Sequence, residues 1–206
     1  AENRWLPDLT KIPENIARKA KLMFLNYPNN PTSATVDDLS FFKEVVRFAK
    51  KYDIIVCHDN AYSEITFNGY VAPSFLQTPG AKDLWVEFYS LSKTYNMAGW
   101  RVGFCLGNSK IIAPLEKFKS FVDYGVPTFL QLAAVTALSS PDDVMKKTLE
   151  EYKKRRDKFC DGLNKIGFIV EKPKATMYLW AKLPEKFKKA GSLKFSEDLI
   201  KTTGVV

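Results

Sequence analysis

The sequence has little histidine and little cysteine. His58 is its one histidine, and the three cysteines, Cys57, Cys105 and Cys160, are far apart and form no C-x-x-C pair. This inventory argues against a zinc site or any other metal site, and against a disulfide framework. It favours reduced, buried thiols, as in a cytoplasmic protein.

Long apolar runs are also missing. No window reaches the ~18 apolar residues that a membrane-spanning helix needs. The chain opens AENRWLPDL, without the basic and then apolar pattern of a secretory leader. The sequence therefore predicts a cytoplasmic protein that has no membrane partner.

The charge is unbalanced, with 31 basic against 23 acidic residues and a net charge of +8. The excess is concentrated at residues 146–158 and 182–194. Both stretches mix signs or fit solvated helix faces, and neither interleaves aromatic with basic residues as a single-strand groove does. We expect no nucleic-acid partner, although the charge suits small anionic ligands.

Apolar runs alternate with amphipathic stretches in the first third of the chain, which is typical of α/β proteins. Residues 22–26 (LMFLN) and 54–58 (IIVCH) are predicted to be buried strands. Between them, apolar residues at spacings of three and four predict a helix over 36–51, capped by Thr35. A strand, helix and strand in this order predict parallel pairing.

Two further strands are predicted at residues 85–89 and 102–106. The polar segment between them is too short for a crossover helix with its loops, so the second of these strands is expected to run antiparallel in a mixed sheet. From residue 109 to 167 the pattern is helical, with breaks at 124–127 (YGVP) and 139–141 (SSP).

The last quarter of the chain predicts part of a second, smaller domain. One apolar stripe runs along its long helix, and short strands are expected at 168–170 and 177–181. We place the large domain at residues 1–145 and the connecting helix with part of the small domain at 146–206. The stripe consists of Met145, Leu149, Tyr152, Phe159, Leu163 and Ile166.

Both ends of the sequence predict a chain cut from a longer one. Residues 1–21 are mostly polar, and the chain stops at TTGVV, where a new apolar run begins.

Four polar segments each follow a predicted strand or flank one. Open α/β sheets bind ligands at the carboxyl ends of their strands, so these segments are expected to converge on one site. Taken singly each has a plain alternative: the N-P pair forms turns, Asp59 can cap a turn, and Lys93 can be a surface lysine. Arg101 lies between two glycines beside an apolar strand and needs an anion, either a carboxylate or a phosphate. The segments are NNPT (29–32), DNAY (59–62), SLSK (90–93) and GWRVG (99–103).

Together these motifs resemble the class I/II aminotransferases of pyridoxal-phosphate (PLP) fold type I. The matching pieces are YPNNPT (27–32), DNAY (59–62) and SLSKTYNMAGWRVGF (90–104). The resemblance implies an α/β large domain, with a mixed, mostly parallel sheet between helices, and part of a small α+β domain. Within the family, the LL-diaminopimelate aminotransferases and related alanine and aspartate aminotransferases are most similar.

The resemblance implies a role for each matching residue. Lys93 would carry PLP as a Schiff base and, once released, move the substrate's α-proton. Asp59 would pair with the ring nitrogen, so that the ring acts as an electron sink. Asn30 and Tyr62 would hydrogen-bond the ring's phenolic oxygen.

The remaining positions would bind phosphate or substrate. Ser90 and Arg101 would hold the phosphate, with Ser92 as a weaker candidate. Asn30 and Tyr124 are the candidate substrate contacts, while His58 is expected to be a strand residue and no catalyst.

The implied reaction moves an amino group between an amino acid, of the LL-diaminopimelate, alanine or aspartate type, and a 2-oxo acid such as 2-oxoglutarate. The full-length enzyme would be a homodimer. A different PLP enzyme of the same fold, such as a C–S lyase, and the effector domain of a PLP-binding transcription regulator remain alternatives.

Two departures from the family pattern bear on activity. Ser33 stands where the family usually has glycine, which matters if the turn requires positive φ. The family's N-terminal phosphate-binding segment with its ring-stacking aromatic is missing, as is the C-terminal arginine for the substrate carboxylate. We therefore expect this chain alone to be inactive and its parent protein to be active.

Overall fold

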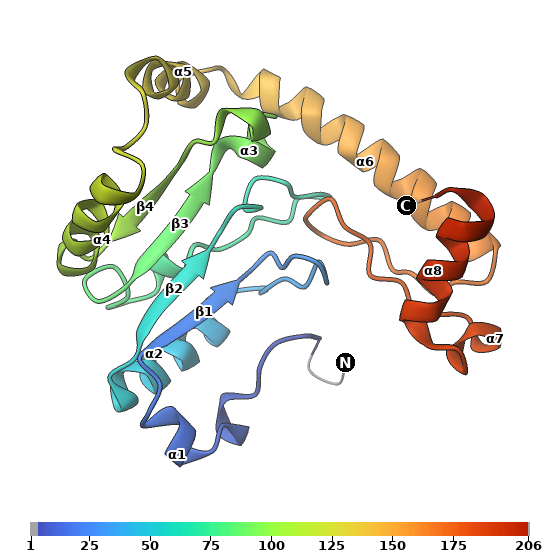
Figure 1. Cartoon of the computed structure of the whole chain (residues 1–206), viewed down its shortest axis with the longest axis horizontal. Coiled ribbons are helices and arrows are strands. Elements are labelled where there is room, and N and C mark those ends of the chain that lie inside the picture. Colours follow the sequence, from blue (N-terminus) through green and yellow to red (C-terminus); the bar gives the residue numbers. More distant parts are fainter. Residues whose placement is uncertain (1–3, 206) are drawn as a thin grey trace.

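A four-stranded mixed sheet forms the centre of the molecule in a computed structural model that describes residues 4–205. The strands lie in the order β1 (Leu22–Asn26), β2 (Ile55–Asp59), β3 (Val86–Ser90) and β4 (Gly103–Gly107). β1, β2 and β3 are parallel, and β4 is antiparallel to β3 (Figure 1). The predicted mixed, mostly parallel sheet is confirmed.

Three of the strands begin one residue later than predicted. The residues before β2 and β3 are still bonded to the turns that precede them: Ile54 N donates to Ala49 O at 3.0 Å and Trp85 N to Ala81 O at 3.0 Å. Before β4, the carbonyl of Val102 accepts from Leu91 N at 3.2 Å. Local turn bonds therefore set where β2 and β3 start, while β4 starts directly after the bond that joins Val102 to Leu91.

Helices connect and flank the strands, and the long helical region after residue 109 breaks at the two predicted places. The α-helices are α1 (Glu14–Ala17), α2 (Ser40–Tyr52), α3 (Leu91–Thr94), α4 (Ser109–Val122), α5 (Thr128–Leu138), α6 (Asp142–Lys165), α7 (Glu185–Lys188) and α8 (Gly191–Thr203). Short 3-10 turns occupy η1 (Leu9–Lys11), η2 (Phe75–Gln77) and η3 (Ala98–Trp100).

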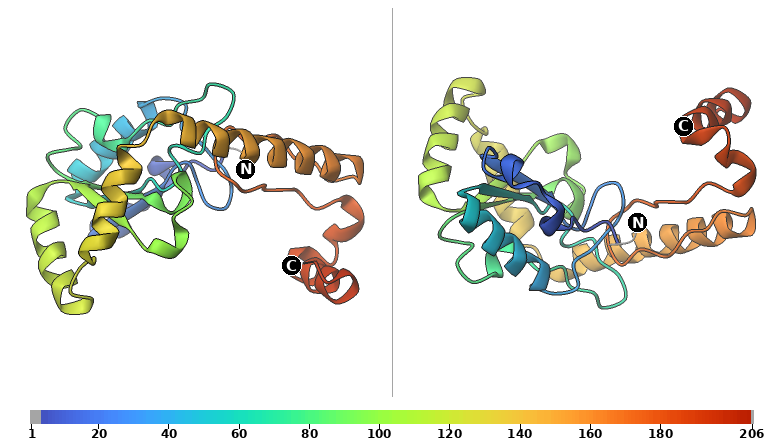
Figure 2. Two further views of the ribbon diagram at one scale, coloured as in Figure 1. Left: turned by 90° about the horizontal axis from the view of Figure 1, so that it is seen from above. Right: turned by 90° about the horizontal axis from the view of Figure 1, so that it is seen from below.

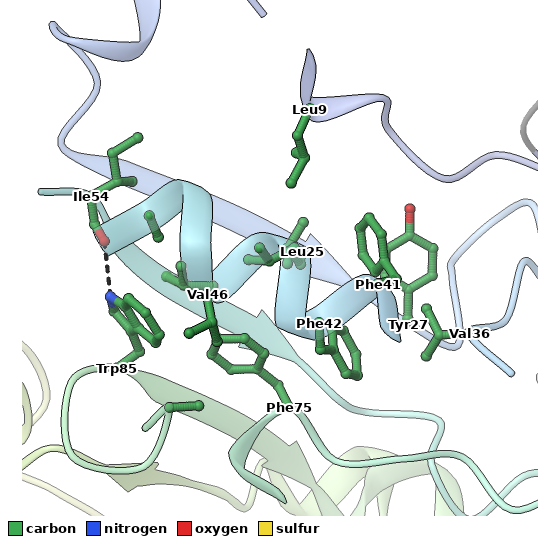
Figure 3. Packing of buried hydrophobic residues seen from close by; sticks show 14 of the residues in the cluster. Leu9, Leu25, Tyr27, Val36, Phe41, Phe42, Val46, Ile54, Phe75 and Trp85 are labelled. Atoms are coloured by element: carbon green, nitrogen blue, oxygen red, sulfur yellow. Dashed lines mark hydrogen bonds between the residues drawn. The ribbon is translucent and has the colours of Figure 1, made fainter. Parts of the chain in front are cut away.

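The main core lies between α2 and the sheet. Phe42 and Val45 of α2 and Val56 of β2 are completely buried, and Phe75 of η2 packs edge-on against Phe42 with ring centroids 5.5 Å apart (Figure 3). Each such side chain contributes about 1.5–3 kcal/mol on burial. In the same core, the indole of Trp85 donates to Ile54 O at 2.9 Å, which ties the start of β3 to the start of β2.

Helix α2 starts later than the sequence predicts, and Thr35 does not cap it. The helix begins at Ser40, whose backbone N–H donates to the Asp38 carboxylate at 2.7 Å. Upstream, the carbonyl of Val36 accepts from the Tyr70 hydroxyl at 2.7 Å. This tertiary bond holds Val36 outside the helix, although the apolar periodicity predicted that the helix would begin there.

Helix α6 leads from the sheet to the C-terminal segment. It extends away from the sheet, and α7 and α8 lie on the side of the molecule toward which it runs (Figure 2). The face it buries carries Arg156 and Cys160, while Phe159 and Ile166 of the predicted stripe are 59% and 67% exposed. The predicted domain boundary at 145/146 falls in its first turn and stays a prediction.

The strands predicted at 168–170 and 177–181 do not form. This segment makes only isolated bridges among the described residues, Ile169 with Lys182 and Thr66 with Ala175. Its backbone is held instead by side chains of α6: Arg156 donates to Pro173 O at 2.9 Å and Asn164 to Val170 O at 3.0 Å. A short apolar run forms a strand only where a partner ladder is available, and here it is bonded to a helix.

The exposed charges of α6 pair along the helix, as in Lys153–Asp157 at 3.0 Å and Arg155–Glu151 at 3.0 Å. Among the described helices none is long and apolar enough to span a bilayer. All three cysteines are free.

Candidate cofactor site

The candidate site lies where β1, β2 and β3 end. Their registers align these ends: Asn26 lies opposite Asp59, and Asp59 opposite Phe88. The backbone of Asn60 continues the pairing with a bond to Phe88 O at 2.8 Å. The loops that follow β1 and β2, and α3 after β3, therefore leave the sheet from one edge, as the predicted convergence requires.

Asn26, which the sequence analysis did not single out, organises the loop after β1. Its amide donates to Asp59 O at 2.8 Å and its Oδ1 accepts from Asn30 N at 2.6 Å. Within the loop, Asn29 Oδ1 accepts from the backbone and hydroxyl of Thr32 at 3.1 and 2.6 Å. A polar residue that ends an apolar strand just before a turn was the available signal for Asn26.

Three predicted residues from three segments meet here. The Asn30 amide donates to the Tyr62 hydroxyl at 3.4 Å, and Lys93 Nζ lies 5.8 Å from the centroid of the Tyr62 ring. Tyr62 is 4% exposed. Burial, and then the neighbouring hydroxyl of Tyr178, raise the pKa of Tyr62 well above its usual value, which keeps it protonated at neutral pH.

Asp59 is the last residue of β2 and lies at the exposed end of the strand. Its side chain is exposed, whereas those of the three preceding residues are buried. Within residues 4–205 its carboxylate makes no hydrogen bond and no ion pair, so it is available to a ligand cation. This position suits its predicted role without testing it.

His58 points the opposite way and belongs to a buried network. It is completely buried, and its Nδ1 lies 2.8 Å from Glu87 Oε2. Glu87 also accepts from Asn60 Nδ2 at 3.1 Å, Ser74 Oγ at 2.8 Å and the backbone of Phe75 at 2.8 Å. Burial acts to raise the pKa of Glu87, but these bonds outweigh it and hold the pKa below its usual value.

Helix α3 presents the lysine. Ser90 caps the helix by accepting from Ser92 N at 3.2 Å, and Lys93, the residue after Ser92, is half-buried. Leu91 is completely buried in a cluster that includes Ala134 of α5, which fixes the helix against the body of the protein. α3 is only four residues long, so packing rather than helix propensity holds it.

Arg101 enters at the same end of the β3–β4 pair, because Ser90 lies opposite Gly103 in the ladder. It is exposed, adopts a left-handed conformation (φ 54°) and donates to Ala98 O at 2.7 Å. Among the described residues no carboxylate pairs with Arg101. The structure therefore does not support the alternative in which Arg101 forms an internal ion pair.

Tyr124 is not brought to this group. It lies between α4 and α5, is 94% exposed and adopts φ 57°.

Tyr178 is present at the site without having been predicted. Its hydroxyl lies 2.7 Å from the Tyr62 hydroxyl, with the two rings edge-to-face at 5.5 Å. It comes from the segment after α6, far away in sequence, and one tyrosine within an apolar run gave no signal for it.

A mixed, mostly parallel sheet flanked by helices is the architecture of the fold type I PLP proteins. The chain belongs to the family "Aminotransferase class I and II", whose profile matches residues 1–206. PLP is the cofactor of this family.

Comparison with individual proteins supports the same family. The chain is 50% identical over 206 residues to the LL-diaminopimelate aminotransferase of Moorella thermoacetica and 50% identical over 205 residues to that of Gloeobacter violaceus. Among solved structures it is similar to substrate-bound BacF from Bacillus subtilis, with a TM-score of 0.92 and 44% identity, and to an aminotransferase from Staphylococcus aureus, with 0.89 and 35%. Both structures are matched over all of this chain.

The chain spans about half the length of the curated relatives it matches, 52% in both cases named. It covers 51% of the BacF chain and 54% of the Staphylococcus chain.

Proposed function

We propose that the whole protein is a PLP-dependent aminotransferase and that Lys93 is the lysine that attaches the cofactor. The observation that carries the proposal is the meeting of Lys93, Tyr62 and Asn30 beside the free carboxylate of Asp59. These groups come from the ends of three neighbouring strands, and among the side chains that the structure describes no ion pair engages Lys93 or Asp59.

The residues present fit the cofactor by their chemistry. A free carboxylate suits a protonated ring nitrogen, and a protonated tyrosine hydroxyl with an amide suits a phenolic oxygen. A guanidinium without a carboxylate partner suits a phosphate, as do Ser90 and Ser92 beside it. PLP, when bound, supplies an electron sink for the bond to the substrate's α-carbon.

Each residue then has a definite task. Lys93 would hold the cofactor through its amine, in a condensation that releases water, and would afterwards hold and return the proton removed from the substrate's α-carbon. Asp59 keeps a proton on the ring nitrogen. Tyr62 and Asn30 donate to the phenolic oxygen, and Arg101 with Ser90 holds the phosphate, with Ser92 in a lesser part.

The relatives' names support a finer reading. Several curated relatives are called LL-diaminopimelate aminotransferase. We propose an amino acid of that type, or of the alanine or aspartate type, as donor and a 2-oxo acid such as 2-oxoglutarate as acceptor. Asn30 is the proposed substrate contact here, with Tyr124 as a second that needs a further partner surface. A cytoplasmic homodimer is the proposed working state.

An absorbance spectrum of the whole protein tests the proposal. A visible band of bound cofactor is expected in the wild type, abolished by borohydride and absent from Lys93→Ala. Lys82→Ala, at an exposed lysine of the turn before β3, is the matched control and should keep the band. A wild type without the band, after addition of PLP, contradicts the proposal.

A further inference from the structure

The Tyr62 hydroxyl has more hydrogen-bonding neighbours than the predicted site supplies. It lies 3.4 Å from Asn30 Nδ2 and 2.7 Å from the Tyr178 hydroxyl. A tyrosine hydroxyl has one proton to donate and two lone pairs with which to accept. The direction of the Tyr62–Tyr178 bond therefore decides whether Tyr62 keeps a proton for a ligand.

Asn30 settles part of this question, because an amide N–H only donates. One lone pair of Tyr62 is used by Asn30. If Tyr178 also donates, the second lone pair is used too, and the proton of Tyr62 can go only to a third group. If Tyr62 donates to Tyr178 instead, no proton remains for the ligand.

We propose that Tyr178 is a positioning residue that donates its hydroxyl proton to Tyr62 and so fixes Tyr62 as a hydrogen-bond donor toward the cofactor's phenolic oxygen. This inference rests on the proposed function, since it needs PLP beside Lys93. It assigns a role to a residue outside the four strand-end segments.

The backbone of Tyr178 is held at both of its polar groups, which supports a positioning role. Its N–H donates to Thr176 Oγ1 at 3.2 Å, and its carbonyl accepts from Ser33 Oγ at 2.8 Å. Ser33 and Thr176 also bond to each other, at 2.5 Å. Because the single proton of Ser33 goes to Tyr178, Thr176 is the donor in that last bond.

This clasp of Ser33, Thr176 and Tyr178 joins the segment after α6 to the loop that carries Asn30. The same loop contains Asn30 and Ser33. One short stretch of backbone therefore positions both groups that donate to Tyr62, the Asn30 amide directly and the Tyr178 hydroxyl through Ser33. Ser33 and Thr176 are 9% and 1% exposed, which shields these bonds from competing water. The conformation that brings Ser33 into the clasp is left-handed, with φ 57°.

Burial raises the pKa of Tyr62, so its hydroxyl keeps its proton through the neutral range and has one to donate. The direction of the Tyr62–Tyr178 bond is what the titration below decides. The edge-to-face arrangement of the two rings keeps their hydroxyls together without help from a ligand.

The test is a pH titration of the bound cofactor's absorption band in the whole protein, with Tyr178→Phe, Tyr62→Phe and the double variant. Phenylalanine keeps the ring packing and removes only the hydroxyl. A hydrogen bond donated to the phenolic oxygen stabilises the less protonated form of the bound cofactor, so losing it raises the pH at which the band titrates. Both single variants should raise that midpoint, Tyr62→Phe by more.

The double variant separates a role through Tyr62 from an independent one. If Tyr178 acts through Tyr62, adding Tyr178→Phe to Tyr62→Phe changes nothing further. The dissociation constant of PLP should rise roughly twofold to tenfold in Tyr178→Phe, as expected for one neutral hydrogen bond. Tyr70→Phe is the matched control, because it removes another part-buried tyrosine hydroxyl, bonded to Val36 O at 2.7 Å, outside the site.

Each outcome decides. A raised midpoint in Tyr178→Phe that vanishes in the Tyr62→Phe background supports the inference. An unchanged midpoint in Tyr178→Phe, or an additive shift in the double variant, overturns it while the band itself still supports the proposed function. A wild type without any cofactor band overturns both.

Discussion

Two neighbouring residues of β2, His58 and Asp59, show two different uses of polar side chains. His58 is completely buried and bonded to Glu87, whose carboxylate accepts four hydrogen bonds. Asp59 is exposed at the strand end, and within residues 4–205 its carboxylate has no partner. Successive side chains of a strand point to opposite faces, so adjacent positions can serve structure and chemistry separately.

The polar groups available for chemistry are those that the fold leaves without a partner. The network consists of the buried residues His58, Asn60, Phe75 and Glu87 with the part-buried Ser74, and both oxygens of the Glu87 carboxylate accept hydrogen bonds within the protein. The strand-end set, Asn30, Asp59, Tyr62 and Lys93, keeps groups that still need a partner. A satisfied carboxylate stabilises the fold, whereas an unsatisfied one is ready for a ligand.

The strongest test of the buried side is Glu87→Ala. It leaves four donors, three of them on buried residues, without their acceptor and should lower the free energy of unfolding by about 3–5 kcal/mol. Urea denaturation of the whole protein measures this. Glu64→Ala, at an exposed glutamate, is the control and should change the value by less than about 0.5 kcal/mol. A loss at Glu87 no larger than the control's would contradict the network's structural role.

Asp59→Asn tests the strand-end set. It should lower kcat by roughly 10²–10³-fold, the range for removing one preorganised electrostatic partner, because the ring nitrogen loses its negative partner. Since the Asp59 carboxylate is exposed and makes no hydrogen bond or ion pair among the described side chains, the melting temperature should hardly move. Steady-state kinetics and a thermal melt check both parts. A variant that loses stability but keeps its kcat would show that Asp59 serves the fold and not the chemistry.

The pH dependence of stability separates the two carboxylates further. Glu87 has a lowered pKa in the folded protein, so its stabilising contribution is complete above the ordinary value of 4.5 and is lost as the pH falls through the folded value. The wild type should therefore lose stability below pH 4.5 more steeply than Glu87→Gln. Urea titrations over about pH 3–7 compare them. Equal slopes would show that Glu87 is not the group responsible.

The sequence predicted the parts whose pattern is local and failed where tertiary bonds decide. The four strands of the sheet and the helix breaks follow from apolar runs and Gly or Pro positions, and the antiparallel direction of β4 follows from the shortness of the segment before it. The late start of α2 does not, because the Tyr70 hydroxyl holds Val36 outside the helix. The two C-terminal strands fail for the same reason, since Arg156 and Asn164 bond that backbone.

The site divides in the same way. Asn30, Asp59, Tyr62 and Lys93 could be predicted as site residues because they follow strands in recognisable motifs. Tyr178 was not, because nothing near it in sequence indicates that its hydroxyl lies 2.7 Å from that of Tyr62.

The smallest expected effect is at Ser33, which joins the loop that carries Asn30 to the segment after α6. Ser33→Ala removes its two bonds but keeps the left-handed backbone cost, so stability should fall by about 0.5–1.5 kcal/mol. Ser33→Gly loses the same bonds and relieves a strain of about 1 kcal/mol, so it should be close to neutral. Chemical denaturation that finds the glycine variant less stable than the alanine variant would contradict this account.

The most direct test of the central claim is to reduce the whole protein with borohydride in the presence of PLP and to map the modified peptide by mass spectrometry. The account predicts one stable adduct, on Lys93 in the SLSK segment, and its disappearance in Lys93→Ala. An adduct on another lysine, or none in the wild type, would contradict the assignment of Lys93.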